Sequence, residues 1–159
     1  MLIIADTSAL VAISTCDGLQ WLDTLFDELQ VPNAVYIEAI TEGKPQAEKL
    51  KRYLADKVAG TDLSELIIAA PGMGKGELEA MALYRKRKAD RLLIDDLRAR
   101  KVALYNNIQV VGSVGILLMA KNQGLIKAIR PHLERIQKSE VHLGDALIAE
   151  ALKMAGEAI

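Results

Sequence analysis

The sequence predicts an α/β fold, a three-layer α/β/α sandwich with a mainly parallel central sheet. Residues 2–5 form a continuous apolar run of strand length, which is typical of a strand buried on both faces. Further short apolar runs alternate with segments of helical periodicity, a pattern that indicates strand–helix–strand units. Because crossovers in such units are right-handed, the carboxyl ends of the parallel strands should share one edge of the sheet. Open α/β sheets bind their ligands at that edge.

The length and composition favour a single domain over residues 1–159. A chain of 159 residues can bury a sizeable core, and with only 4% aromatic residues that core must consist mostly of Leu, Ile, Val and Ala. The lone cysteine, Cys16, excludes an intrachain disulfide framework and suits a reducing compartment. A formal net charge of -1 excludes a strong overall attraction to nucleic acid, but the 20 Lys and Arg residues leave room for a local basic face.

The sequence has no recognisable targeting or membrane segment. The first apolar run stops at Asp6 and no basic segment precedes it, unlike the composition of a signal peptide. No run approaches the ~20 apolar residues that a membrane span requires. We therefore expect a cytoplasmic protein that makes no use of a membrane.

The N-terminal half should fold into a buried strand followed mainly by helices. Asp6, Thr7 and Ser8 follow the strand at residues 2–5, and these residue types commonly open helices. Apolar positions at helical spacing predict the elements that come next. These are helices at residues 8–14, 19–29, 33–40 and 44–58, with a short strand at residues 30–31.

The C-terminal half continues the alternation of strands and helices. Residues 71–74, rich in Gly and Pro, should form a loop. The strand expected at residues 91–94 runs directly into Asp95 and Asp96. The remaining expected elements are strands at residues 66–70 and 109–111 and helices at residues 77–88, 97–105, 113–122, 126–137 and 142–155.

Acidic residues stand at the ends of the strands and on the helices that follow them. Asp6 ends the first strand, and the pair Asp95 and Asp96 ends the strand at residues 91–94. Glu38 lies on the helix after the second strand, and Glu77 opens the helix after the Gly-rich loop. Carboxylates gathered at one edge repel each other without a cation, and Mg²⁺ or Mn²⁺ prefers such oxygen ligands. These ions can activate water and stabilise a displacement at phosphorus.

Each of these residues also has an ordinary structural interpretation. An Asp before a helix is usually an N-cap, which would explain Asp6 and one member of the Asp95–Asp96 pair. Glu38 alone would be a solvated helix residue, and Glu77 alone would balance the dipole of its helix. Only their joint placement on an α/β pattern indicates a metal site.

At these residues the sequence resembles the PIN-domain family, over roughly residues 1–130, with residues 131–159 as additional C-terminal helices. The opening IIADTSAL is similar to the first PIN strand with its Asp-x-Ser/Thr turn, and VPNAVYIEAI resembles the second PIN block with its acidic residue. Three further segments resemble a prokaryotic PIN subfamily whose members are largely uncharacterised: GKGELEAMAL, LLIDDLRARKVA and VVGSVGILLMAKNQGLI. Many relatives are VapC-like ribonuclease toxins of toxin–antitoxin pairs.

The resemblance implies a PIN-like fold and hydrolysis of RNA phosphodiester bonds that depends on Mg²⁺ or Mn²⁺. The residues that correspond to the acidic site of the family are Asp6, Glu38, Glu77 and Asp96. Asp95 is a further candidate ligand, and Ser8 would orient the carboxylate of Asp6. The implied partners are RNA and, if the chain is a toxin, an antitoxin protein.

The third acidic block departs from the common PIN pattern. Many PIN toxins have Asp-Ala-x-Ile-Ala there, whereas residues 76–80 of this chain read Gly-Glu-Leu-Glu-Ala. Glu reaches further than Asp, which puts the coordination in doubt, and Glu79 would replace Glu77 if the helix started later. An Asp-Ala-Leu-Ile-Ala string does occur at residues 145–149, but we interpret it as an amphipathic helix because no strand follows it.

Two other functions compete with the nuclease. The strand–loop–helix pattern around residues 66–77 is that of a phosphate-binding loop, but a Walker motif needs a different glycine spacing and Ser or Thr after the lysine. Here Lys75 is followed by Gly76 and Glu77, and a carboxylate at the helix start would repel phosphate. The other rival is a PIN-like module that binds RNA or protein without cutting.

Several cations are candidates for contacts with RNA. Residues 84–88, Tyr-Arg-Lys-Arg-Lys, form the densest basic run, which suits either a helix terminus or a phosphate-binding patch. We favour Arg98, Arg100 and Lys101, because they follow the proposed metal site closely in the sequence. The largely apolar helices are consistent with a homodimer, although burial within one chain would explain the same pattern.

Overall fold

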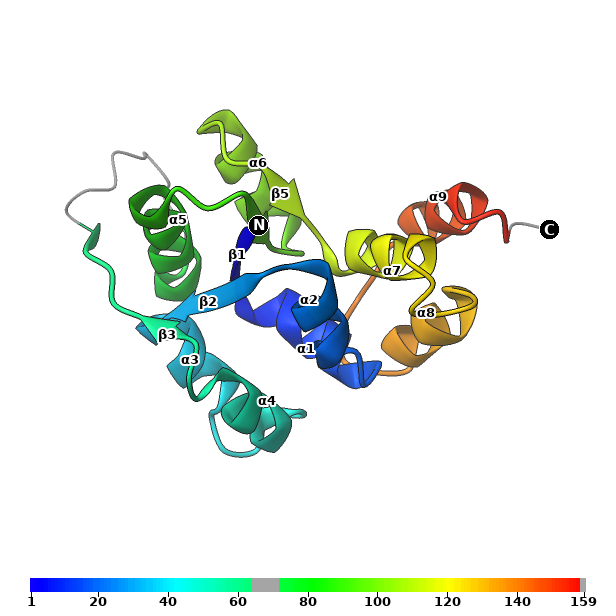
Figure 1. Ribbon diagram of the computed structural model, residues 1–159, viewed down its shortest axis with the longest axis horizontal. Helices are drawn as coiled ribbons and strands as arrows, with labels where there is room; N and C mark the ends of the chain where they lie inside the picture. Colours follow the sequence, from blue (N-terminus) through cyan, green and yellow to red (C-terminus); the bar gives the residue numbers. More distant parts are fainter. Residues whose placement is uncertain (64–71, 158–159) are drawn as a thin grey trace.

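The computed structural model describes residues 1–63 and 72–157, and its centre is a parallel sheet (Figure 1). In the described part of the chain the sheet has five strands in the order β3-β2-β1-β4-β5, and each neighbouring pair is parallel. The strands are β1 (Leu2–Ala5), β2 (Glu28–Pro32), β3 (Val58–Ala59), β4 (Arg91–Leu93) and β5 (Val110–Val111). This sheet confirms the predicted α/β fold.

Helices cover both faces of the sheet. They are α1 (Thr7–Thr15), α2 (Leu19–Leu25), α3 (Asn33–Ala39), α4 (Ala47–Leu54), α5 (Lys75–Arg87), α6 (Leu97–Tyr105), α7 (Ser113–Asn122), α8 (Arg130–Gln137) and α9 (Asp145–Met154). Helix α5 packs on β2, β1 and β4 and against α3, while α2 contacts β2 and packs with α1 against α7 (Figure 1). Among the described residues, no helix is long and apolar enough to cross a membrane.

The core lies around the two central strands. Ile3 and Ile4 of β1 and Leu92 and Leu93 of β4 are fully buried, as expected for apolar strands covered on both faces. Cys16 is also buried and its thiol donates to the carbonyl oxygen of His132 at 3.4 Å, so it behaves as a core residue. Burial raises the pKa of this thiol to about 11, which leaves it protonated and unreactive near neutral pH.

The sequence-based prediction for residues 44–58 was wrong. The helix occupies only Ala47–Leu54, and Val58–Ala59 forms the edge strand β3, in register with Val31 and Pro32 of β2. Periodicity could not separate the two, because a two-residue strand is too short to show alternation and its apolar residues also fit a helix.

Other boundaries also differ from the expected ones. The helix expected at residues 19–29 ends at Leu25, because Leu29 pairs with Ile3 in the sheet. The last two helices are shorter than expected and begin at Arg130 and Asp145. The strand expected at residues 66–70 lies outside the described residues.

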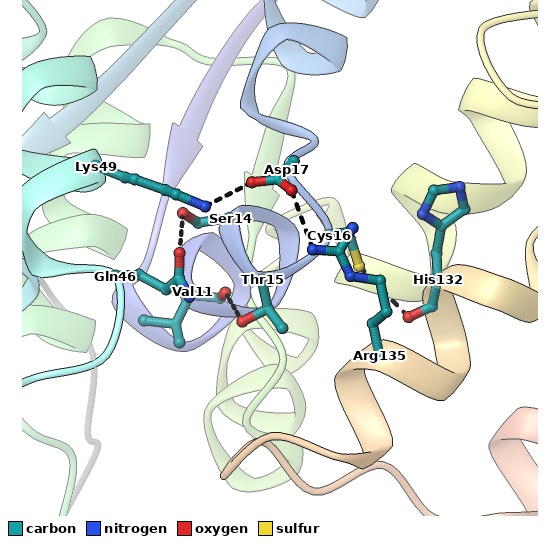
Figure 2. A network of polar contacts seen from close by, with 9 residues as sticks. All are labelled: Val11, Ser14, Thr15, Cys16, Asp17, Gln46, Lys49, His132 and Arg135. Carbon is teal, nitrogen blue, oxygen red and sulfur yellow. Dashed lines mark hydrogen bonds and ion pairs between the residues drawn. The ribbon is translucent and has the colours of Figure 1, made fainter.

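The C-terminal end of α1 holds helices α4 and α8 in place (Figure 2). Asp17 follows this end with a left-handed backbone, at a φ of 54°. Its carboxylate accepts from Lys49 of α4 at 2.5 Å and from Arg135 of α8 at 3.0 Å. One turn earlier, the Ser14 hydroxyl donates to the Gln46 side chain at 2.9 Å, directly before α4 begins. Both helices are therefore docked on α1 by polar contacts.

Candidate active site

The pairing of β1 with β4 brings the acidic ends of the two strands together. The backbone N–H of Asp6 donates to the carbonyl oxygen of Leu93 at 2.8 Å, so the residues after both strands lie side by side. The Asp6 side chain is only 5% exposed, and it forms no capping hydrogen bond to α1. The interpretation of Asp6 as an ordinary helix cap therefore does not explain why its carboxylate is buried.

Helices α3 and α5 approach the Asp6 carboxylate from the side of Gly76. A Cβ atom added to Gly76 would lie 2.9 Å from Oε2 of Glu38 and 3.8 Å from Oδ1 of Asp6. These two carboxylates therefore converge on the first turn of α5, where a larger residue than glycine would displace the Glu38 carboxylate. Gly76 was not recognised from the sequence. The signal in the sequence was a glycine within the first turn of a helix. Glycine lowers helix propensity, so its presence there could have suggested a close approach of another group.

The environment of Asp6 disfavours its ionised form. Burial raises the pKa of this carboxyl most strongly, and the negative charges of Glu77, Glu38 and Asp96 raise it further. The backbone N–H of Thr7 opposes these effects, yet the pKa still reaches about 7. Three carboxylates from other elements thus act on the buried carboxyl of Asp6.

Glu77 and Asp96 contribute to this cluster while they also cap helices. The N–H of Gly74 donates to Oε2 of Glu77 at 2.8 Å, at the start of α5. The N–H of Ala99 donates to Oδ2 of Asp96 at 2.8 Å, at the start of α6. Each carboxylate has a second oxygen, for which no hydrogen bond is formed within the described residues. Asp96 is therefore the member of the Asp95–Asp96 pair that caps the helix.

Three other predicted or alternative residues are engaged elsewhere or lack the expected contact. Asp95 accepts from both the backbone N–H and the hydroxyl of Ser113, each at 2.7 Å. Glu79 accepts from the N–H of Ala34 at 3.1 Å and so caps α3. The Ser8 hydroxyl is buried without a hydrogen-bond partner among the described residues, so the expected bond that orients Asp6 is not formed.

The three basic residues expected to contact RNA lie on α6 and do not line the groove described below. The Arg98 guanidinium lies against the backbone of Gly72, and that of Arg100 lies against Gly112 beside Asp95. Lys101 is exposed on α6.

A groove of about 360 Å³ lies beside the acidic cluster. It is lined by Thr7, Ser8, Val11, Thr15, Glu38, Ala39, Lys44, Pro45, Asp95, Asp96, Ser139, Glu140, Val141 and His142. The contributions of Lys44 and residues 139–142 were not foreseen from the sequence. Among the described residues, no three Asp, Glu, His or Cys side chains already stand close enough together to hold a metal ion.

The fold and the acidic cluster define an α/β protein with carboxylates collected at the carboxyl edge of a parallel sheet. A family model for the PIN domain matches residues 2–157, so the chain belongs to the PIN-domain family. PIN domains are generally nucleases, and PIN nucleases typically use divalent metal ions. Searches among curated proteins and among solved structures found no match.

Proposed function

We propose that this chain is a metal-dependent ribonuclease that hydrolyses RNA phosphodiester bonds with Mg²⁺ or Mn²⁺. The observation that carries the proposal is the buried Asp6 carboxyl, whose pKa is raised to about 7 by burial and by three neighbouring carboxylates. Such a group is costly to ionise unless a cation arrives, and a divalent cation with oxygen ligands removes that cost.

The chemistry of the donor set suits a divalent ion, whose binding would draw the carboxylates closer together. Asp6, Glu38, Glu77 and Asp96 would hold it, because the other three lie near enough to Asp6 for their charges to act on its carboxyl. Glu77 and Asp96 each use one oxygen as a helix cap, which leaves the other oxygen for a ligand. A bound ion of this kind would supply activation of water and stabilisation of charge at phosphorus. Asp95 accepts two hydrogen bonds from Ser113, so it would stabilise the neighbouring Asp96 and its helix start without binding the ion itself.

The residues of the cluster differ in exposure, which suggests a division of roles. Asp6 is buried and held between β1 and α5, so it would anchor the site. Glu38 and Asp96 are exposed and line the groove, so they would face the arriving RNA and water. Gly76 would keep the space between Asp6 and Glu38 open.

Cleavage of single-stranded RNA by the purified chain tests the proposal. Cleavage should require Mg²⁺ or Mn²⁺, stop with a chelator, and be lost in Asp6→Asn. Asp56→Asn is the matched control, because Asp56 is exposed and pairs with Lys57 away from the site. RNA that is bound but never cut, together with an unchanged Asp6→Asn variant, would instead support a non-catalytic binding module.

We further propose a more specific role for this ribonuclease, as the toxin of a toxin–antitoxin pair. It predicts that expression of the chain stops growth and that the Asp6→Asn variant does not. A gene for a small DNA-binding protein beside the gene of this chain would supply the antitoxin. Nuclease activity without growth arrest would remove the toxin role and leave the enzyme.

A further inference from the structure

The groove beside the acidic cluster is built from segments that are far apart in the sequence. Its floor is one face of α1, where Ser8, Val11 and Thr15 recur at helical spacing over about 10 Å of the helix axis. Lys44 and Pro45, before α4, form one wall. Residues 139–142, between α8 and α9, form another wall. The acidic cluster stands at the end of the floor where α1 begins.

The polar network at the end of α1 fixes both walls. Figure 2 shows Gln46 and Lys49 on one side of α1 and Arg135 on the other. The Ser14–Gln46 bond holds the chain just after Pro45, and the Asp17–Arg135 pair holds α8 just before the second wall. These contacts tie both walls to the same end of α1 and favour their arrangement around the groove.

Unsatisfied polar atoms at the acidic end of the groove point to a ligand. The hydroxyl oxygens of Thr7 and Ser8 are buried and have no hydrogen-bond partner among the described residues, and both residues line the groove. Buried hydroxyls are almost always paired in proteins, so a polar ligand that reaches this end would satisfy them.

The size of the groove and the position of its cation indicate which ligand fits, because the other charged lining residues, Glu38, Asp95, Asp96 and Glu140, are all acidic. A volume of about 360 Å³ suits one nucleotide-sized group, whereas a duplex needs a far larger surface. Lys44 is the one Lys or Arg in the described lining, and its ammonium forms no ion pair within the described residues, unlike Lys49, which binds Asp17. The opposite wall carries Glu140, which repels phosphate, next to the ring of His142. A phosphate would therefore lie at Lys44 and a base at His142.

We propose that the groove holds one nucleotide of single-stranded RNA beside the bond to be cut, with Lys44 on a phosphate and His142 stacked on the base. This inference rests on the nuclease function proposed above. Single-stranded RNA is commonly recognised by stacking of unpaired bases on rings that include histidine.

Binding of a short fluorescein-labelled single-stranded RNA of degenerate sequence, measured by anisotropy, tests the groove. All variants are made in the Asp6→Asn background, so that binding is read without cleavage. Lys44→Ala should lower the slope of log affinity against log salt by about 0.7, the value for one phosphate contact on a single strand. Lys138→Ala is the matched control, because this exposed lysine adjoins the second wall but does not line the groove. It should leave the slope unchanged.

The stacking contact has its own test. His142→Ala should weaken binding roughly 5- to 150-fold, as removal of a stacking ring does, while His142→Phe should retain most of the affinity. The groove assignment is overturned if Lys44→Ala and His142→Ala bind this RNA as tightly as Lys138→Ala does. It is also overturned if His142→Phe binds as weakly as His142→Ala.

Cleavage by the otherwise wild-type chain separates this inference from the proposed function. If that chain cuts RNA with Mn²⁺ but the Lys44 and His142 variants keep its KM, the nuclease stands and the groove assignment fails. If it does not cut, but RNA affinity depends on both side chains, the groove assignment stands and the nuclease fails. A rise in KM for both variants, with a smaller change in kcat, supports the two together.

Discussion

Replacing Asp6 with Asn should make the chain more stable at neutral pH, although it removes the central group of the candidate site. In the absence of divalent ions, the pKa of Asp6 is about 7 in the folded chain, against 3.8 for an ordinary aspartate. Between these two values the folded state binds a proton that the unfolded state has lost. Stability should therefore fall as the pH rises through this range and level off above it.

The magnitude follows from the same two values. Each pH unit between 3.8 and about 7 costs the folded state about 1.4 kcal/mol, so the ionised carboxylate destabilises it by about 4 kcal/mol in total. The amide of Asn carries no charge and has almost the same shape, so Asp6→Asn should abolish this cost. The two proteins should have similar stability near pH 4, and the variant should be more stable by about 4 kcal/mol near pH 8.

Urea denaturation in the presence of chelator, at a series of pH values, measures this difference. Asp56→Asn is the control, because Asp56 is exposed and a hydrogen bond from Lys57 lowers the pKa of its carboxyl. Asp56→Asn should slightly lower the free energy of unfolding at neutral pH, and this loss should disappear as the pH falls. Parallel stability curves for Asp6→Asn and the unaltered chain would refute the reasoning, as would a variant that is less stable at high pH.

Three further changes test other parts of the structure. In Gly76→Ala, the new methyl group would lie 2.9 Å from Oε2 of Glu38 and displace this carboxylate. Mn²⁺ should therefore raise the melting temperature less than in the unaltered chain, as measured by thermal shift. The variant should still fold, because Ala has a higher helix propensity than Gly. Ser113→Ala removes the hydroxyl that donates to Asp95 at 2.7 Å, and urea denaturation should show a loss of about 1.5–3 kcal/mol, as for a hydrogen bond to a charged group. Burial raises the pKa of Glu157, but the N–H groups at the start of α8 and the Lys121 ammonium outweigh it and lower the pKa overall. The stability that Glu157 contributes should therefore be lost in acid, and Glu157→Gln should lower the melting temperature near neutral pH and much less at low pH, as calorimetry would show. A melting temperature that is unchanged in Glu157→Gln would contradict this role.

The features that follow from local sequence were predicted well. Continuous apolar runs predicted the central strands, since a strand covered on both faces needs no polar position. The placement of Asp6 and the Asp95–Asp96 pair after two such strands predicted that they would meet at one edge, and the pairing of β1 with β4 brings them there. The two-residue strand β3 was missed because its apolar residues continue the helical spacing of the segment before it, whereas the equally short β5 was predicted at residues 109–111.

The use of each carboxylate could not be predicted from the sequence. Asp96 caps α6 and Asp95 binds Ser113, although the two residues are adjacent and chemically identical. The difference arises because successive residues after a strand point in different directions, and only one of these directions meets the helix start. The favoured basic residues on α6 do not line the groove, and their contact with RNA stays a prediction.

By itself, therefore, the sequence determined the α/β class, the buried strands and the acidic residues at their ends. These features depend only on a run of apolar residues and the polar residue that directly follows it. Only the tertiary structure decided that Asp6 is buried among carboxylates and that Gly76 leaves room beside it. It alone also brought Lys44 and residues 139–142 into one groove with α1. These two segments are almost a hundred residues apart in the sequence, so no local pattern could predict that they would meet. In the fold, Asp17 pairs with Lys49 of α4 and with Arg135 of α8, next to the two segments.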